Sequence, residues 1–230
     1  MADSGHSTAT LRLAMGALRI AHPITVPTAS VPAAEIVPAL QGLVNAVVEA
    51  AEAGNTVSCR KGCGACCRQL VPVSRTEGER LSQLVDAMPN ERRETLLARF
   101  AAAEAAIEGA GLKDRGERSD RELSTAYFAL GIACPFLEEE SCSIHPERPL
   151  VCREYLVTSP AELCSGAAQE GVTPVAVPKV SMAARGLQDE GDEWFPLALL
   201  LAWHRTRPRG GSRRPGPEWV RRFLKELGRK

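Results

Sequence analysis

Four cysteines fall within nine residues in the segment 59–67, which reads CRKGCGACC. Glycine on each side of Cys63 permits a tight turn that aims the neighbouring side chains inward. The spacing of Cys63 and Cys66 lets two thiolates converge on one metal ion or on one edge of a cluster. Positive charge near a thiol favours the thiolate, and three basic side chains accompany this run: Arg60, Lys61 and Arg68. The pattern predicts a metal site whose thiols have lowered pKa values.

A second group of cysteines follows about seventy residues later, at Cys134, Cys142, Cys152 and Cys164. Prolines stiffen the loops between them, at Pro135, Pro146 and Pro149. Rigid loops suit metal ligands because less chain freedom is lost when the metal binds. We therefore expect the two groups to meet at one metal-bearing site.

Thiolate donors select zinc or an iron–sulfur cluster among the common cellular metals. The predicted ligands are Cys59, Cys63, Cys66, Cys67, Cys134, Cys142 and Cys152. Both a tetrahedral zinc ion and a [4Fe–4S] cluster take four cysteines, and we prefer the cluster. Eight cysteines allow two sites, or one site with spare thiols. Adjacent Cys66 and Cys67 either ligate different metals, or one ligates while the other packs or reacts.

Several residues near the cysteines have an ordinary structural interpretation beside the functional one. Cys164 fits a buried apolar side chain as well as a ligand. A redox pair at Cys63 and Cys66 would normally accompany a βαβ pattern, which the sequence lacks. We interpret His145 as a surface or hydrogen-bonding residue. Three others serve either as anion-binding groups or, preferably, as structural hydrogen-bonding groups: Arg148, Arg153 and Tyr155.

Composition and charge set the class of protein. The chain has 230 residues, 44% hydrophobic and 24% charged, and a formal net charge of zero. These values exclude a wholly disordered or collagen-like chain. We find no signal-peptide pattern and no apolar run long enough to span a bilayer, so we expect a cytoplasmic protein with no membrane partner. Thiols stay reduced in that compartment, which favours metal over disulfides.

Helical periodicity dominates the elements that must position the cysteines. Only 4% of residues are aromatic, so the core is built mainly from Ala, Leu and Val, which favours helices. A capping box at Ser74–Glu77 predicts the start of one helix. Helices are also expected near 33–53, 90–108, 121–130 and 193–204, and a last helix is expected to begin at Pro217. The predicted fold is mainly α, a helical scaffold around cysteine-rich metal-binding loops.

We expect three segments. Residues 1–31 form a loosely ordered N-terminal arm with one short strand near Ile24–Val26. Residues 32–204 form the cysteine-cluster metal-binding domain, and residues 205–230 a basic linker with a C-terminal amphipathic helix. This last segment carries ten basic and two acidic residues. Such a tail can bind nucleic acid through phosphates, but we favour a solvated linker and a helix packed on the core.

The cysteine motifs resemble a known family. SCRKGCGACC, then CPFL, then CSIHPERPLVCREY are similar to the bacterial YkgJ-like cysteine-cluster proteins, whose signature is CxxCxxCC. In this chain three residues, rather than two, separate Cys59 from Cys63. The resemblance implies zinc or iron chelation by the matching cysteines and a relationship to flagellin lysine N-methylases. The chain shows no glycine-rich nucleotide loop, so its own residues do not support a complete methylase.

Three functions are therefore open. The first is a metal-binding protein with an iron–sulfur cluster or zinc, acting in redox chemistry or metal handling. The second is a protein-modifying enzyme related to lysine N-methylases, with a substrate pocket beside the cysteines. The third is a structural zinc module that docks a protein partner.

Overall fold

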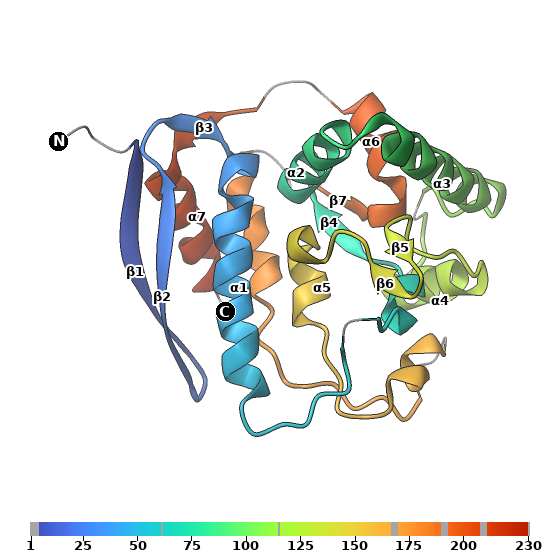
Figure 1. The fold of residues 1–230 in the computed structure, drawn as a ribbon, viewed down its shortest axis with the longest axis horizontal. Coiled ribbons are helices and arrows are strands. Elements are labelled where there is room, and N and C mark those ends of the chain that lie inside the picture. The colour runs from blue at the N-terminus through green and yellow to red at the C-terminus, as the bar shows by residue number, and fades with distance from the viewer. Residues whose placement is uncertain are drawn as a thin grey trace.

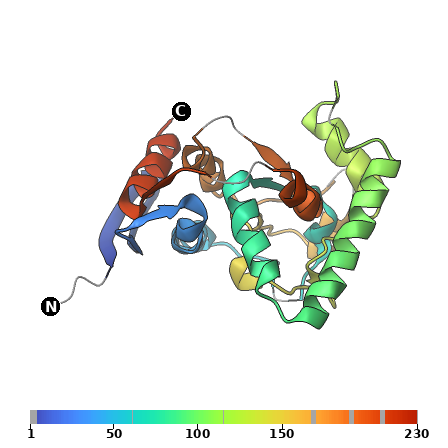
Figure 2. The ribbon, with the colours of Figure 1, turned by 90° about the horizontal axis from the view of Figure 1, so that it is seen from above.

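The computed structural model describes residues 5–60, 62–114, 116–166, 170–189, 193–207 and 211–229. Helices make up about half of the chain and strands less than a fifth, so the fold is mixed rather than mainly α. Two groups of elements stand side by side, with the short helix α5 (Leu150–Glu154) between them (Figures 1 and 2). We call the left-hand group in Figure 1 the hairpin lobe and the right-hand group the cysteine lobe.

The hairpin lobe corrects the expectation of a loosely ordered arm. β1 (His6–Met15) and β2 (Leu18–Pro27) form a ten-residue antiparallel hairpin, and the short strand expected at Ile24–Val26 is only the end of β2. Alternating apolar side chains bury one face of this hairpin, and Gly16, with φ of 59°, begins the two-residue turn. Threonines and prolines within these two strands obscured the alternation of apolar side chains, so the sequence did not predict the hairpin.

Four further elements complete the hairpin lobe: η1 (Ala33–Ile36), α1 (Val37–Glu52), η5 (Val180–Leu187) and α7 (Gly216–Leu227). The apolar face of α1 packs against β2, and α7 packs against η5. Trp219 is 1% exposed at the centre of this core. By length and composition, Ala33–Glu52 also qualifies as a candidate membrane span, but 56% of that window is buried here. Packing inside this lobe accounts for its apolar composition.

Paired strands and an internal ion-pair network fix the C-terminal segment. β8 (Arg213–Pro215) pairs with β3 (Ser30–Pro32), so the expected linker 205–217 contains a strand. Asp189 accepts hydrogen bonds from Ser212 and from Arg214, the latter at 2.7 Å. The guanidinium groups of Arg214 and Arg222 both lie over the Trp219 ring. Much of the local positive charge is thus engaged within the protein.

Longer helices and short strands make the cysteine lobe. The elements are β4 (Pro72–Ser74), α2 (Arg75–Asp86), α3 (Asn90–Gly109), α4 (Asp120–Ala129), β7 (Trp194–Pro196), η6 (Leu197–Leu199) and α6 (Leu200–Thr206). The capping box at Ser74 and Glu77 is confirmed. The helix expected over 193–204 begins instead with β7, because Trp194–Pro196 pairs with β4. These elements enclose two apolar clusters beside the cysteine loops.

Candidate metal centre

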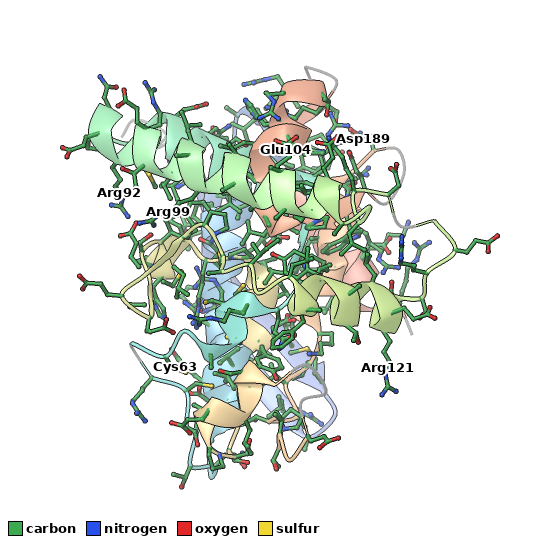
Figure 3. All side chains as sticks on the ribbon, turned by 90° about the vertical axis from the view of Figure 1, so that its right-hand side faces the viewer. Cys63, Arg92, Arg99, Glu104, Arg121 and Asp189 are labelled. Carbon is green, nitrogen blue, oxygen red and sulfur yellow. The ribbon has the colours of Figure 1, made fainter. Side chains whose placement is uncertain are left out.

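One cavity of about 990 Å³ joins the two cysteine groups. Seven of the eight cysteines line it: Cys59, Cys63, Cys66, Cys67, Cys134, Cys142 and Cys152. The same wall carries Arg60, Arg148, His145 and Tyr155, and α4 closes another side with Arg121, Ser124 and Thr125. In Figure 3, Cys63 and Arg121 lie at opposite sides of this region. Segments separated by some seventy residues therefore share one hollow.

Tight turns position the first cysteine group. Gly62 has φ of 86°, a conformation that favours glycine, and the amide of Cys63 donates to the Arg60 carbonyl at 3.0 Å. The 3₁₀ turn η2 (Ala65–Arg68) then carries Cys66 and Cys67. A Cβ on Gly64 would lie 2.7 Å from the side chain of Leu137. Any larger residue at position 64 would require the side chains of Leu137 and Glu140, or the turn itself, to move.

A small hairpin positions the start of the second group. β5 (Leu137–Glu138) and β6 (Ser141–Cys142) form it, and its turn residues Glu139 and Glu140 both have positive φ. Glu140 accepts two hydrogen bonds from Arg68, at 2.6 and 3.0 Å, which ties the hairpin to η2. The amide of Cys134 also donates to the Cys67 carbonyl at 2.7 Å. The two cysteine groups are thus joined through the backbone and through an ion pair.

Helix α3 supports the same hairpin from the other side. Phe136 is 1% exposed, and its ring meets Phe100 edge-on at 5.3 Å between centroids. Arg99 extends from α3 toward the hairpin (Figure 3) and donates to Glu138 at 3.2 Å. Packing and charge together hold Cys134 and Cys142 on the cavity wall.

A buried carboxylate positions Cys152. Glu77 caps α2 through Ser74, and its other oxygen accepts the amide of Leu150 at 2.8 Å, at the first residue of α5. One side chain thus caps two helices, and α5 carries Cys152. Burial raises the pKa of Glu77, although its hydrogen bonds favour the charged form. The sequence predicts the first cap, but the second depends on a contact between residues 73 positions apart.

Arg153 is a structural cross-link. It is 3% exposed and donates to the carbonyls of Arg148 and Pro146 and, at 2.9 Å, to Asn45 of α1. Burial and the nearby Arg148 lower its pKa to about 10. These bonds support the preferred structural interpretation of Arg153 and fix the loop that leads from Cys142 to Cys152.

Arg148, in contrast, faces the cavity. Its Nε is buried and has no hydrogen-bond partner among the described residues. Its positive charge acts to lower the pKa values of Cys66 and Cys142, against the larger effect of burial. A buried donor of this kind fits a negatively charged occupant.

Burial raises the pKa values of several cysteine thiols around the cavity. Burial raises the pKa of Cys134 to about 12 and that of Cys152 well above its usual value. A hydrogen bond to Cys67 and burial together raise the pKa of Cys66. The expected lowering by nearby basic residues is therefore wrong for these thiols. Arg68 is paired with Glu140 instead, and Lys61 lies outside the described residues.

The thiols surround the cavity without converging at its centre. Within the described ranges, no three side chains of His, Cys, Asp or Glu gather closely enough to hold a metal ion. Four sulfurs around one zinc would lie about 3.8 Å apart, given a Zn–S distance of about 2.3 Å. Rotation about χ1 moves a cysteine sulfur without moving the backbone. The soft donor set and the partnerless Arg148 nitrogen fit a thiolate-bound metal.

Cys164, Tyr155 and His145 lie at the edges of the site. His145 is exposed at the rim. Cys164 is buried outside the cavity lining, and the Tyr155 hydroxyl lies 4.0 Å from its sulfur. Cys164 is therefore the one cysteine outside the cavity lining, and the identity of the coordinating cysteines stays a prediction. Sequence reasoning predicted the helix α4 but missed its place in the cavity wall, since no local pattern links its polar side chains to the cysteines.

Comparison with known proteins identifies the same segment. Residues 58–170 match the family model CxxCxxCC, described as "Putative zinc- or iron-chelating domain". The match starts just before Cys59 and includes Cys164 as well as the cavity-lining cysteines. No curated protein and no solved structure matches the chain.

Proposed function

We propose that this chain, whose residues 58–170 match the CxxCxxCC family model, binds an iron–sulfur cluster, preferably [4Fe–4S], with thiolates of its cysteine cavity. The family match supports metal binding in general, with zinc or iron as the metal. The single observation that carries the proposal is that seven cysteines from two distant segments line one cavity. Thiolates are the ligands that zinc and iron–sulfur clusters share.

The charge of Arg148 and the size of the cavity favour a cluster over a single metal ion. A centre with four thiolates carries net negative charge, and the partnerless Nε of Arg148 offers a donor and a positive charge beside it. A cavity of about 990 Å³ far exceeds the space of one ion, since one water takes about 30 Å³. When bound, a cluster would supply one-electron chemistry, and the cysteines and Arg148 would hold and tune it.

The test is anaerobic purification followed by analysis of iron, zinc and sulfide. We expect a brown protein with iron and sulfide in equal amounts, and loss of both in Cys63→Ser and Cys66→Ser. Ser124→Ala, a cavity-lining change without a thiol, should leave the metal content unchanged. A colourless protein with stoichiometric zinc would instead support the structural zinc module. Wild-type protein without metal, or cysteine variants with full metal content, would refute metal binding at this site.

The size of the cavity favours a protein-modifying enzyme as a second candidate. Its volume lies at the top of the range of about 300–1,000 Å³ for small-molecule sites. The wall away from the cysteines combines apolar Leu70 and Leu197 with Arg121 and the hydroxyls of α4. Arg153 does not line it, because it is buried behind the loop. Binding of a lysine-bearing peptide to metal-loaded protein, lost in Leu197→Trp, would support this candidate, and no binding would count against it.

We also propose a reducing compartment, the cytoplasm, for this protein. All eight cysteines are free in the structure, including the adjacent pair Cys66 and Cys67. Thiols so close together persist where reductants keep them reduced or where metal protects them.

A further inference from the structure

The cavity has room for more than a metal centre. Its volume is about 990 Å³, whereas the eight inorganic atoms of a [4Fe–4S] cluster, at about the 30 Å³ of one water each, would take up about a quarter of it. The space that is left still lies within the range of about 300–1,000 Å³ for small-molecule sites. A ligand of that class can therefore occupy the cavity beside the metal.

Apolar side chains form much of the cavity wall. Four of them are at most 6% exposed and belong to the packed cores of the protein: Phe136, Ile144, Leu156 and Leu197. Leu70 adds a partly buried apolar surface to the same wall. Firmly packed apolar walls with a few polar groups are typical of sites that enclose the body of a small molecule.

Helix α4 contributes polar groups to this wall. Its apolar face, with Leu123 and Tyr127, shares an apolar cluster with residues of α3 and η6. Its polar face carries Arg121, Ser124 and Thr125, and all three line the cavity. Residues three and four apart on a helix are neighbours on its surface, so one guanidinium group and two hydroxyl groups lie together here.

The polar groups of α4 are available to a ligand. In the part of the chain that the structure describes, the hydroxyls of Ser124 and Thr125 form no hydrogen bond, whereas the Ser82 hydroxyl donates to the carbonyl four residues earlier. Arg121 is exposed and forms no ion pair within the same part of the chain. The next residue, Glu122, is instead bonded in the capping box of α4.

The charges of the lining also fit a negatively charged ligand. Among the described residues, the lining carries three arginines, Arg60, Arg121 and Arg148, and a single carboxylate, that of Glu52. The proposed metal centre accounts for the positive charge of Arg148. Arg121 lies across this region from Cys63 (Figure 3), so its charge remains for another occupant.

We propose that the cavity also binds an anionic small molecule, which has a carboxylate or phosphate head and an apolar body. Arg121, Ser124 and Thr125 hold the head, because a guanidinium group binds both kinds of head through paired, charge-assisted hydrogen bonds. The body lies against Leu70 and Leu197. Because Arg121 is exposed and Leu197 is buried, the head lies at the mouth and the body inside. This inference goes beyond metal binding and does not require it.

Calorimetric titration with model anions tests the ligand class. The probes are benzoate and phenyl phosphate, with benzyl alcohol as the neutral analogue, each added to purified protein of known metal content. We expect at least one anion to bind at least about tenfold more tightly than the alcohol, since the alcohol lacks a charged head. The tighter anion identifies the head group. Binding of neither anion, or equally tight binding of the alcohol, would overturn the proposal.

Variants of α4 test whether its polar face holds the head. Arg121→Met should weaken anion binding by about tenfold or more, and Ser124→Ala by about two- to tenfold. Arg121→Lys keeps the charge but loses the paired geometry, so its affinity should lie between those of Arg121→Met and wild type. Arg118→Met is the matched control, because Arg118 precedes α4 and does not line the cavity. Wild-type affinity in Arg121→Met would overturn the proposal.

Metal analysis of the same samples separates this inference from the proposed function. Protein that contains iron or zinc but binds neither anion would refute the anionic ligand site alone. Protein without metal whose anion binding depends on Arg121 would refute metal binding in the cavity and support the ligand site. The two failures are therefore distinguishable.

Discussion

The hairpin lobe and the cysteine lobe are stabilised in different ways. The hairpin lobe buries periodic apolar faces of β2, α1 and α7 around Trp219, and its contacts follow from the repeat of each element. Around the cavity of the cysteine lobe, short turns and two-residue strands are connected by single polar contacts, such as Arg68 with Glu140. Apolar packing thus fixes one lobe, whereas the cavity side of the other depends on specific bonds and, we propose, on metal.

The largest expected effect tests whether the hairpin lobe is independent of the metal. Trp219→Ala removes a fully buried side chain and its hydrogen bond to the Val31 carbonyl, and should cost about 3–5 kcal/mol in the free energy of unfolding. We expect metal content per folded chain to stay at the wild-type level. Urea unfolding and elemental analysis measure the two quantities. Loss of metal in the folded variant would show that the lobes are strongly coupled.

The next effect concerns the charge beside the thiols. Arg148→Met should weaken metal retention against a chelator by about tenfold or more, because a charge-assisted hydrogen bond contributes about 1.5–3 kcal/mol. Arg121→Met is the matched control, since it removes a cavity-lining arginine from the α4 side. Competition with a coloured chelator measures the rate of metal loss from each of the two variants. Equal metal loss in the two variants would argue against a specific role for Arg148.

A smaller effect is expected where the two cysteine groups touch. Gly64→Ala places a Cβ 2.7 Å from the side chains of Leu137 and Glu140, so these side chains or the turn must shift, at a cost of about 1–3 kcal/mol. The metal content of Gly64→Ala should fall together with its stability. At Gly109, by contrast, a Cβ meets nothing within 4 Å, and Gly109→Ala should be neutral or slightly stabilising. Thermal unfolding of both variants, with metal analysis, checks this contrast, and wild-type behaviour of Gly64→Ala would contradict it.

The smallest expected effect on stability concerns a carboxylate on the surface of the hairpin lobe. Hydrogen bonds from Ser212 and Arg214 hold the pKa of Asp189 below its usual value. A lowered pKa in the folded state adds stability above the unfolded pKa of about 3.9, and this stability is lost as the pH falls through the folded value. Asp189→Asn should therefore cost less than about 1 kcal/mol at pH 7, because the site is partly exposed. The difference from wild type should shrink as the pH falls through the folded pKa of Asp189, and a difference that stays unchanged as the pH falls through the acid range would exclude this cause.

Local signals in the sequence gave reliable predictions, whereas contacts between distant segments did not. The capping box at Ser74 and Glu77 was predictable because both partners lie within one helical turn. The β1–β2 hairpin was missed because Pro23 and Pro27 suggested a broken chain, although both fit its register. Likewise β7 was taken for helix, since its pairing with β4 joins segments over a hundred residues apart.

The same contrast between local signals and contacts of distant segments applies to the candidate site. Cysteine spacing and type were enough to predict metal chemistry and seven cavity-lining residues. The second cap formed by Glu77 and the contribution of α4 depend on tertiary packing, which leaves no periodic trace in the sequence.

The backbone hydrogen bond from Cys134 to Cys67 has a kinetic consequence. This bond closes the loop between residues 67 and 134 before any metal binds. The apoprotein has therefore already lost the conformational entropy that closing this loop costs. Capture of a metal at the proposed site then does not have to close this loop, whereas a zinc finger must fold around its ion. Metal uptake at the proposed site should consequently leave the contact between the two cysteine groups in place.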